Sequence, residues 1–313
     1  MLPLGGAGRR PTGASVNPRV ERIASHVSDV GGLPIQRALP NRDCRSIGAW
    51  CFADHAGPAT TPRRMNVGPH PHTGLATFSW MIEGEILHRD SLGSEQVLRP
   101  GQVNLMTAGR GISHSEEGRS DRLHLAQLWI ALPDAERERA PGFQHFPELP
   151  HLDLGGFDAT LLVGELGGRR SPVPSFTPLL GVDLAASGPA DALLALRPGF
   201  EHGLMSLEGE VEVAPAGHGA VETIAPGTLL YVGAGCASVE LRCPTAARLL
   251  LLGGEPWAAP PLLWWNFVGR EPAEMAAWAA DWAREDGGRF GSVRGYDGPR
   301  LAVPPVPALR RPG

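Results

Sequence analysis

The sequence predicts an all-β fold made of two similar halves, and three observations support this fold class. From Val20 onward, short apolar runs alternate with turn sequences such as ALPNRD, SLGSE and RPGQ, a spacing typical of strands. The 313 residues include 41 glycines and 31 prolines, a content that suits many short strands joined by turns. One series of landmarks also occurs twice, as two copies of a β-unit would produce.

The repeated series runs strand, glycine turn, strand, Pro-Gly turn, strand. The string MIEGEI that begins at Met81 is echoed by SLEGEV from Ser206, and the pair Pro100-Gly101 is echoed by Pro226-Gly227. The copies are offset by 125 and then 126 residues. This shared order and spacing predict a duplicated β-barrel or β-sandwich.

Three segments are expected along the chain. Residues 1–18 are rich in Gly, Pro, Arg and Ser and have no apolar periodicity, so we expect a flexible N-terminal arm. Because about 150 residues is a usual domain length, the remainder divides into domains at 19–150 and 151–313. The turn-rich string FQHFPELPHLDLGG marks the join near residues 145–160.

One helix is expected, late in the second domain. Glu271-Pro272 begins it, because a proline in the first turn lacks only an N–H that would be unpaired there. Gly287-Gly288 is expected to end it. Its apolar face, predicted to be core or a docking surface, comprises Met275, Trp278, Ala279 and Trp282. A proline-rich tail over 299–313 is expected to lie extended on the surface.

Composition and charge argue against several classes of protein. A net charge of −5 and a pI of about 6.1, without any basic run, argue against direct nucleic-acid binding. No apolar stretch reaches the roughly 18 residues of a transmembrane helix, so no membrane partner is expected. The first residues lack the apolar core of a secretory signal. The four cysteines form no CxxC motif and are expected as reduced thiols in a cytoplasmic protein.

Four polar side chains form the candidate chemical site. His70-Pro-His72 places two imidazoles at i and i+2, on one face of a strand, and His114-Ser-Glu116 does the same with an imidazole and a carboxylate. The 42 residues between the two pairs allow about three strands to return the chain across a barrel. Three neutral nitrogens and one carboxylate oxygen suit a divalent first-row metal with one or two positions left open.

Either pair alone is a weak signal, because surface histidine pairs are common. Their place within one duplicated β-unit favours the metal site. The lack of sulfur ligands argues against a closed structural zinc site and leaves Fe(II), Mn(II), Co(II), Ni(II) and Cu(II) open. If strand alternation continues after His72, the side chains that also face the barrel interior are those of Ala76, Phe78, Trp80 and Ile82.

The second half is expected to lack a metal site. At the repeat offsets, His114 corresponds to Glu240 and His72 to Arg197, and no HxH pair occurs there. His202 stands alone and is expected to be a structural or surface histidine. In the first half, His88 follows the glycine turn and is a candidate hydrogen-bond partner for a metal ligand.

Several strings of this sequence resemble those of the pirin family of the cupin superfamily. They are HPHTGLAT from His70, EGEILHRDSLG from Glu83, RPG from Arg99 and MTAGRGISHSE from Met106. DHAGP from Asp54 and WNFV from Trp265 resemble further family signatures. The resemblance covers about residues 20–305.

The resemblance implies two tandem cupin barrels, each a double-stranded β-helix or jelly roll, followed by a short C-terminal helix. It implies one mononuclear Fe(II) in the N-terminal barrel, held by His70, His72, His114 and Glu116. It also implies a dioxygenase that cleaves flavonols such as quercetin with O2. Glu116 would be the catalytic proton acceptor in that reaction. Asp54 and His55, in the string before the ligands, are expected near the site.

Two other functions stay open. Pirin resemblance also implies a non-catalytic, redox-responsive iron protein that binds transcription factors or metabolic enzymes. A third hypothesis is an oxygen-independent isomerase or decarboxylase that uses Mn(II) or Zn(II). The arginine and glutamate usual in the family are replaced by Thr73 and Ala76, which is expected to alter the pocket and the substrate more than metal binding.

Overall fold

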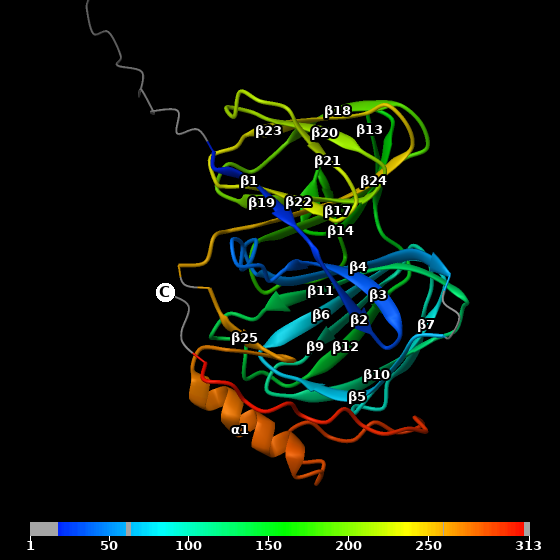
Figure 1. Ribbon diagram of the computed structural model, residues 1–313, viewed down its shortest axis with the longest axis vertical. Coiled ribbons are helices and arrows are strands. Elements are labelled where there is room, and N and C mark those ends of the chain that lie inside the picture. Colours follow the sequence, from blue (N-terminus) through cyan, green and yellow to red (C-terminus); the bar gives the residue numbers. More distant parts are fainter. Residues whose placement is uncertain (1–17, 61–63, 259, 310–313) are drawn as a thin grey trace, which may run out of the picture.

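The computed structural model describes residues 18–60, 64–258 and 260–309 of the chain. The arm expected over residues 1–18 lies, apart from Pro18, outside these ranges. Within them the chain forms two antiparallel β-sandwiches, which lie one above the other in Figure 1, and one short helix. The predicted all-β class and the predicted late helix are therefore confirmed.

The first sandwich packs a seven-stranded sheet against a four-stranded sheet. The large sheet has the spatial order β12 (Gly142–Phe146), β9 (Val103–Thr107), β6 (Leu75–Glu83), β11 (Arg122–Ala131), β4 (Trp50–Thr60), β3 (Leu33–Leu39) and β2 (His26–Val30). The small sheet has the order β5 (Asn66–His72), β10 (Ile112–Gly118), β7 (Ile86–Asp90) and β8 (Glu95–Leu98). Both predicted histidine-bearing strands, β5 and β10, are neighbours in the small sheet.

The second sandwich repeats this arrangement. Its large sheet has the order β1 (Val20–Ala24), β22 (Thr228–Val232), β19 (Glu201–Glu208), β24 (Ala247–Gly254), β17 (Leu179–Ala186), β14 (Phe157–Val163) and β13 (His151–Leu154). Its small sheet has the order β18 (Ala190–Ala195), β23 (Ser238–Cys243), β20 (Val211–Pro215) and β21 (Glu222–Ile224). Two hairpins, β15–β16 (Glu165–Leu166, Arg169–Arg170) and β25–β26 (Leu262–Trp264, Phe267–Gly269), lie outside these sheets.

One edge strand of each large sheet lies outside the repeated unit. β12 follows the first repeat and pairs with β9, whereas β1 precedes the first repeat and pairs with β22 of the second sandwich. The boundary proposed at residue 150 falls between β12 and β13. An edge strand added in this way covers backbone groups that would otherwise be open to pairing with another chain.

The two large sheets pack face to face and form the main hydrophobic core. Trp50 and Phe78 from the first sandwich share one buried cluster with Leu207 and Leu250 from the second. The Trp50 indole N–H also lies 3.2 Å from the Leu180 carbonyl oxygen, which ties β4 to β17. Because buried side chains of both sandwiches form one continuous hydrophobic cluster, the two sandwiches share a core rather than meeting at a loose domain contact.

One expectation about the first barrel is wrong. Ala76, Phe78 and Trp80 face the second sandwich, in the core between the large sheets, and Ile82 packs against the same core. The alternation that starts at His72 does not continue, because Gly74 turns the chain with a φ of +73° and sends β5 and β6 into different sheets. The odd-numbered residues of β6 therefore face the barrel interior.

The correspondence between the two halves also shifts by one residue. His114 pairs with His70 on β5 and with Asp90 on β7, whereas on β23, the strand in the corresponding place of the second small sheet, the buried residue next to Glu240 is Val239, which pairs with Leu194 and Pro215. Glu240 and Arg197, the counterparts expected from the offsets, are both exposed. A shift of one residue moves a strand's side chains to the other face, so the buried counterparts are apolar.

The helix α1 (Pro272–Ala283) buries the four predicted residues Met275, Trp278, Ala279 and Trp282. Glu271 and Glu274 form a capping box at its start. It ends at Ala283, before the expected Gly287-Gly288. Two residues after the helix, Glu285 adopts a left-handed conformation with a φ of +57°. No helix in the described ranges has the length and apolar character needed to cross a bilayer. All four cysteines are buried and free.

His202 is fully buried in the second sandwich beside Phe200. Neither of its ring nitrogens has a hydrogen-bond partner among the described residues. Burial lowers the pKa of His202 to about 4, so the ring is neutral in the folded protein near pH 7. An imidazole in this position costs stability, because its polar atoms lose water without gaining a partner.

We expect His202→Leu to weaken the dependence of stability on pH. Unfolding releases His202 to a usual pKa of about 6.5, so the unfolded chain binds an extra proton as the pH falls from about 6.5 to 4. This one group therefore costs the wild type about 2 kcal/mol of stability between pH 8 and pH 5, a loss that the variant avoids. Thermal unfolding at pH 5 and pH 8 measures the difference, with exposed His151→Leu as the control. Equal pH dependence in wild type and His202→Leu would contradict this assignment.

Candidate functional site

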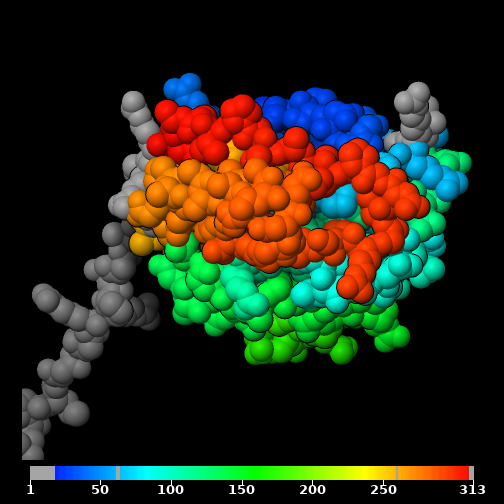
Figure 2. Space-filling model, turned by 90° about the horizontal axis from the view of Figure 1, so that it is seen from below, coloured from blue at the N-terminus to red at the C-terminus, as the bar shows by residue number. Residues whose placement is uncertain are grey.

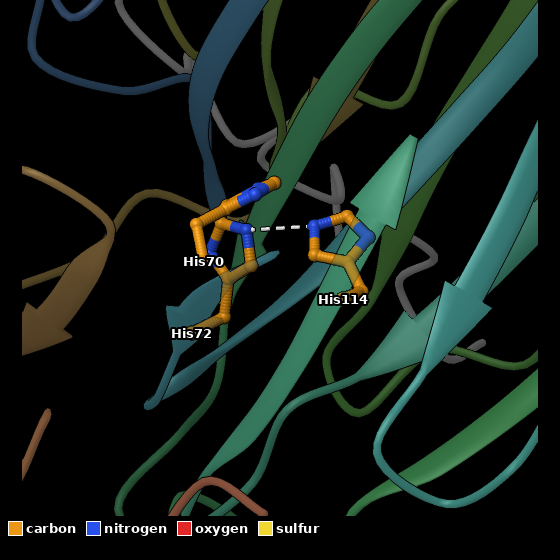
Figure 3. A group of neighbouring side chains, drawn as sticks. All are labelled: His70, His72 and His114. Carbon is orange, nitrogen blue, oxygen red and sulfur yellow. Dashed lines mark hydrogen bonds between the residues drawn. The ribbon is translucent and has the colours of Figure 1, made fainter. Parts of the chain in front are cut away.

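Three predicted ligands converge between the small and large sheets of the first sandwich. His70 and His72 project from one face of β5, and His114 projects toward them from the neighbouring strand β10 (Figure 3). His114 lies directly opposite His70 in the sheet register, and two residues further along the same pair of strands His72 lies opposite Ile112. A ring nitrogen from each imidazole lies within 4.8 Å of the other two.

Each of these imidazoles presents its Nδ1 to a different partner. The Nδ1 of His70 lies 2.8 Å from the Gly68 carbonyl oxygen, and the Nδ1 of His72 lies 3.2 Å from the Asn266 carbonyl oxygen. Carbonyl oxygens only accept hydrogen bonds, so both Nδ1 atoms carry the proton. The Nδ1 of His114 lies 3.3 Å from the Nδ1 of His88. The Nε2 atoms of His70 and His72 are thereby left as lone pairs.

Burial keeps the three rings neutral. It lowers the pKa of His70 to about 4, and it lowers the pKa values of His72 and His114 well below the usual range, with the neighbouring imidazoles adding to the effect. The Nε2 atoms of His72 and His114 are 3.1 Å apart, as the dashed line in Figure 3 marks. Two nitrogens each about 2.1 Å from one metal ion lie roughly 3.0–3.4 Å apart, so this spacing fits a shared cation.

Glu116, the fourth predicted ligand, lies beside this trio rather than within it. One of its carboxylate oxygens is within 4.8 Å of ring nitrogens of His114 and His88. Burial raises the pKa of Glu116, and the nearby His88 lowers it by a smaller amount. A bulge between His114 and Glu116 shifts the register of β10 against β5 at this point.

His88 and Asp90 on β7 lie behind His114. The Nε2 of His88 is 3.2 Å from a carboxylate oxygen of Asp90, and both side chains are almost fully buried. Burial alone would raise the pKa of Asp90, but hydrogen bonds from His88 and from the backbone N–H of Ser94 bring it below its usual value. Asp90 is therefore a charged acceptor at the end of a chain of contacts that leads to His114.

A cavity of about 620 Å³ is lined by all four predicted ligands. Its aromatic wall is formed by Phe52 and Trp129, whose rings stack 4.0 Å apart, and Trp129 meets His72 edge to face. The Arg37 guanidinium lies 4.5 Å from the centre of the Phe52 ring and binds both carboxylate oxygens of Asp54. This volume and this mixture of flat apolar and polar groups are typical of small-molecule sites.

The C-terminal segment returns from the second sandwich to complete the cavity. Trp265 and Asn266, between β25 and β26, and Leu301, in the tail, all line it. The Leu301 N–H donates to the Pro69 carbonyl oxygen, and the Trp282 indole N–H donates to the Leu301 carbonyl oxygen. Figure 2 shows this segment, coloured orange to red, lying across the first sandwich.

The other residues that the sequence analysis placed near the ligands differ in their position relative to the cavity. Asp54 lines the cavity, but His55 points away from it and pairs with His124, with 2.8 Å between their Nε2 atoms. Thr73 is buried and its hydroxyl donates to the Gly109 and Arg110 carbonyl oxygens, while Ala76 lies in the core between the sandwiches. Neither Thr73 nor Ala76 lines the cavity.

Sequence reasoning missed the cavity wall and the acceptor for His72. Phe52 precedes Asp54 by two residues on β4, so strand alternation from Asp54 is a signal that could have found it. Trp129 pairs with Phe52 across β11 and β4, which only the sheet register reveals. Nothing local to His72 points to the carbonyl oxygen of Asn266, which lies 194 residues away along the chain.

Two family models match the chain: Pirin over residues 32–130 and the Pirin C-terminal cupin domain over residues 181–291. A Pseudomonas aeruginosa protein named "putative quercetin 2,3-dioxygenase" is 48% identical over 293 residues, which are 92% of this chain and 91% of the relative. Human pirin is 30% identical over 269 residues, covering 84% of this chain and 91% of the relative.

Solved structures show the same fold. The crystal structure of a quercetin 2,3-dioxygenase from Acinetobacter baumannii superposes with a TM-score of 0.88 at 45% identity, covering 93% of this chain and 97% of that one. A bacterial pirin from Escherichia coli, solved in complex with nickel(II), has a TM-score of 0.60 at 17% identity, covering 76% of this chain and 100% of that one. The predicted pair of cupin barrels is therefore confirmed.

We expect Arg37→Met to reduce the free energy of unfolding by about 3–5 kcal/mol, because it leaves the buried Asp54 carboxylate without its partner. Urea unfolding followed by tryptophan fluorescence measures the loss. Combining it with Asp54→Asn should recover most of the stability, since the neutral amide needs no counter-charge. Wild-type stability in the single Arg37→Met variant would show that the ion pair does not support this wall.

Proposed function

The chain belongs to the pirin family, and we propose that it is a dioxygenase that cleaves flavonols such as quercetin at a mononuclear Fe(II) centre. The observation that carries the proposal is the set of three buried, neutral imidazoles whose ring nitrogens converge on one side of an aromatic-walled cavity. The names of the similar Pseudomonas and Acinetobacter proteins support the substrate class.

The residues present fit a divalent metal. The Nε2 atoms of His70 and His72 keep free lone pairs, and one ring nitrogen each of His70, His72 and His114 lies within 4.8 Å of the other two, an arrangement that a cation would stabilise. His114 and Glu116 would complete a donor set of three nitrogens and one oxygen. That set favours a first-row divalent ion over a closed structural zinc, and it also accommodates Mn, Co, Ni, Cu or catalytic Zn.

The chemistry divides between the ion and the protein. A bound Fe(II) with open positions would supply Lewis acidity toward a substrate oxygen and a place for O2. Glu116 would accept the proton of the flavonol 3-hydroxyl: the O–H bond breaks, its electron pair stays on the substrate oxygen, and the proton passes to a carboxylate oxygen. Glu116 suits this role because, of the four ligands, only its carboxylate has spare lone pairs that can accept a proton. The overall reaction consumes O2 and releases one ring carbon as carbon monoxide.

The cavity suits a flat aromatic substrate with O2 as its partner. Phe52 and Trp129 line the cavity beside His72 and give it an apolar wall against which a planar ring could lie. Trp265 and Leu301 cover the cavity from the C-terminal side and would limit the access of water to the reacting oxygen.

We expect anaerobically purified protein to hold about one metal ion per chain, with iron the ion that supports O2 uptake when quercetin is added. His114→Ala should reduce metal affinity at least tenfold, because it deletes a nitrogen ligand. Glu116→Ala should lower the rate of O2 uptake at least about 100-fold, the scale of a lost general base. Elemental analysis and an oxygen electrode measure the two effects.

His151→Ala is the matched control, because His151 is exposed on the second sandwich and should change neither quantity. Turnover of quercetin at the wild-type rate in both site variants would overturn the proposal. One bound iron per chain without O2 uptake would instead favour the redox-responsive regulator. Absence of metal after reconstitution of the wild type would remove all four ligand assignments.

A further inference from the structure

We propose that Asp90 and His88 are positioning residues that hold His114 in the one tautomer able to bind a metal, an inference that rests on the proposed metal site. His70 and His72 are oriented by carbonyl oxygens, which fix their tautomers directly. His114 instead faces another imidazole, which can either donate or accept a hydrogen bond. Its tautomer therefore depends on what lies behind His88.

The chain of contacts runs from a carboxylate to the site. Asp90 Oδ2 lies 3.2 Å from His88 Nε2, and His88 Nδ1 lies 3.3 Å from His114 Nδ1. The ring of His88 stacks on Phe143 with 4.4 Å between centroids and 15° between planes, which holds its orientation. All three polar side chains are at most 3% exposed, so water offers no alternative partners.

Proton placement is decided at one end of this chain. The Asp90 carboxylate only accepts, so the proton of a neutral His88 ring sits on Nε2 and is donated to Asp90. His88 Nδ1 is then an acceptor, and His114 must place its own proton on Nδ1 to donate to it. The Nε2 of His114 is left as a lone pair facing His72, 3.1 Å away.

The two carboxylate oxygens of Asp90 have separate tasks. Oδ1 accepts from the backbone N–H groups of Leu92 and Ser94 in the turn after β7, at 2.9 and 3.0 Å. Oδ2 faces His88. In an Asp90→Asn variant, the two backbone donors would therefore hold the amide oxygen in the turn, and the NH2 group would face His88.

Asp90→Asn therefore inverts the chain without removing it. The amide donates to His88 Nε2, so His88 must carry its proton on Nδ1 and donate to His114 Nδ1. His114 then carries its proton on Nε2, where it blocks the metal position. The same turn contacts remain, so the change in metal affinity reports the tautomer rather than the fold.

The test is a competition measurement of Ni(II) affinity at pH 8 on the full chain. We expect Asp90→Asn to weaken Ni(II) binding about 10- to 100-fold, the usual effect of losing a partner behind a metal ligand. Asp153→Asn is the matched control, because Asp153 also accepts a hydrogen bond from a backbone N–H in a turn, that of Gly156. This hydrogen bond does not involve a histidine. The control variant should bind Ni(II) as the wild type does.

A double-variant cycle separates tautomer control from turn stability. In His88→Asn, the side-chain oxygen can still accept from His114 Nδ1, but no ring remains to transmit a proton shift. Adding Asp90→Asn to His88→Asn should change Ni(II) affinity less than about twofold. His88→Phe, which offers no acceptor, should bind Ni(II) more weakly than His88→Asn. Thermal unfolding of each variant checks that it folds.

The outcomes distinguish this inference from the proposed function. Wild-type affinity in Asp90→Asn, or an equal loss from Asp90→Asn with and without His88, would overturn the positioning role while leaving the metal site intact. Failure of the wild type itself to bind Ni(II) and Fe(II) would overturn both. A loss in Asp90→Asn that disappears in the His88→Asn background supports the inference.

Discussion

Burial of three neutral imidazoles is the constraint on which the site depends. Each ring N–H removed from water needs an acceptor, and the acceptors come from three parts of the chain: Gly68 on the same strand, Asn266 beyond the second sandwich, and His88 on β7. Once these N–H groups are hydrogen-bonded in this way, the remaining lone pairs lie together at one side of the cavity. The requirement that stabilises the fold therefore also prepares the site for a cation.

The same constraint explains why the C-terminal segment belongs to the first sandwich. The carbonyl oxygen of Asn266 reaches His72 because the β25–β26 hairpin is bridged to the chain just after β5, where Thr73 pairs with Phe267. The tail is fixed further along by contacts to Pro69 and Asn66, whose partners are Leu301 and Tyr296. The first repeat supplies the predicted ligands, but the chain must pass through the whole second sandwich before it supplies the acceptor for one of them.

The sequence predicts what is local or repeated, and the structure adds what sheet register decides. The HxH and HxE pairs indicate shared faces because strand alternation is local, and the duplicated turns predict two similar β-units. The sequence placed Phe78 and Trp80 in the barrel interior, whereas their side chains lie in the core between the two sandwiches. Gly74 turns the chain into another sheet, and strand alternation applies only within one strand. The end of α1 at Ala283 was missed because the left-handed conformation that follows the helix is adopted by Glu285. The sequence suggested that Gly287-Gly288 would adopt it instead, since glycine is the usual residue there.

The second sandwich has the same strand arrangement without this network. On the strand in the place of β10, the buried Val239 pairs with Leu194 and Pro215, and all three lie in or beside an apolar interior. A half-retained network would leave a buried carboxylate or imidazole without its partner, which costs more than an apolar replacement of similar size. Ligands and positioning residues are therefore expected to be kept or lost together, and within this one chain the two halves represent the two outcomes.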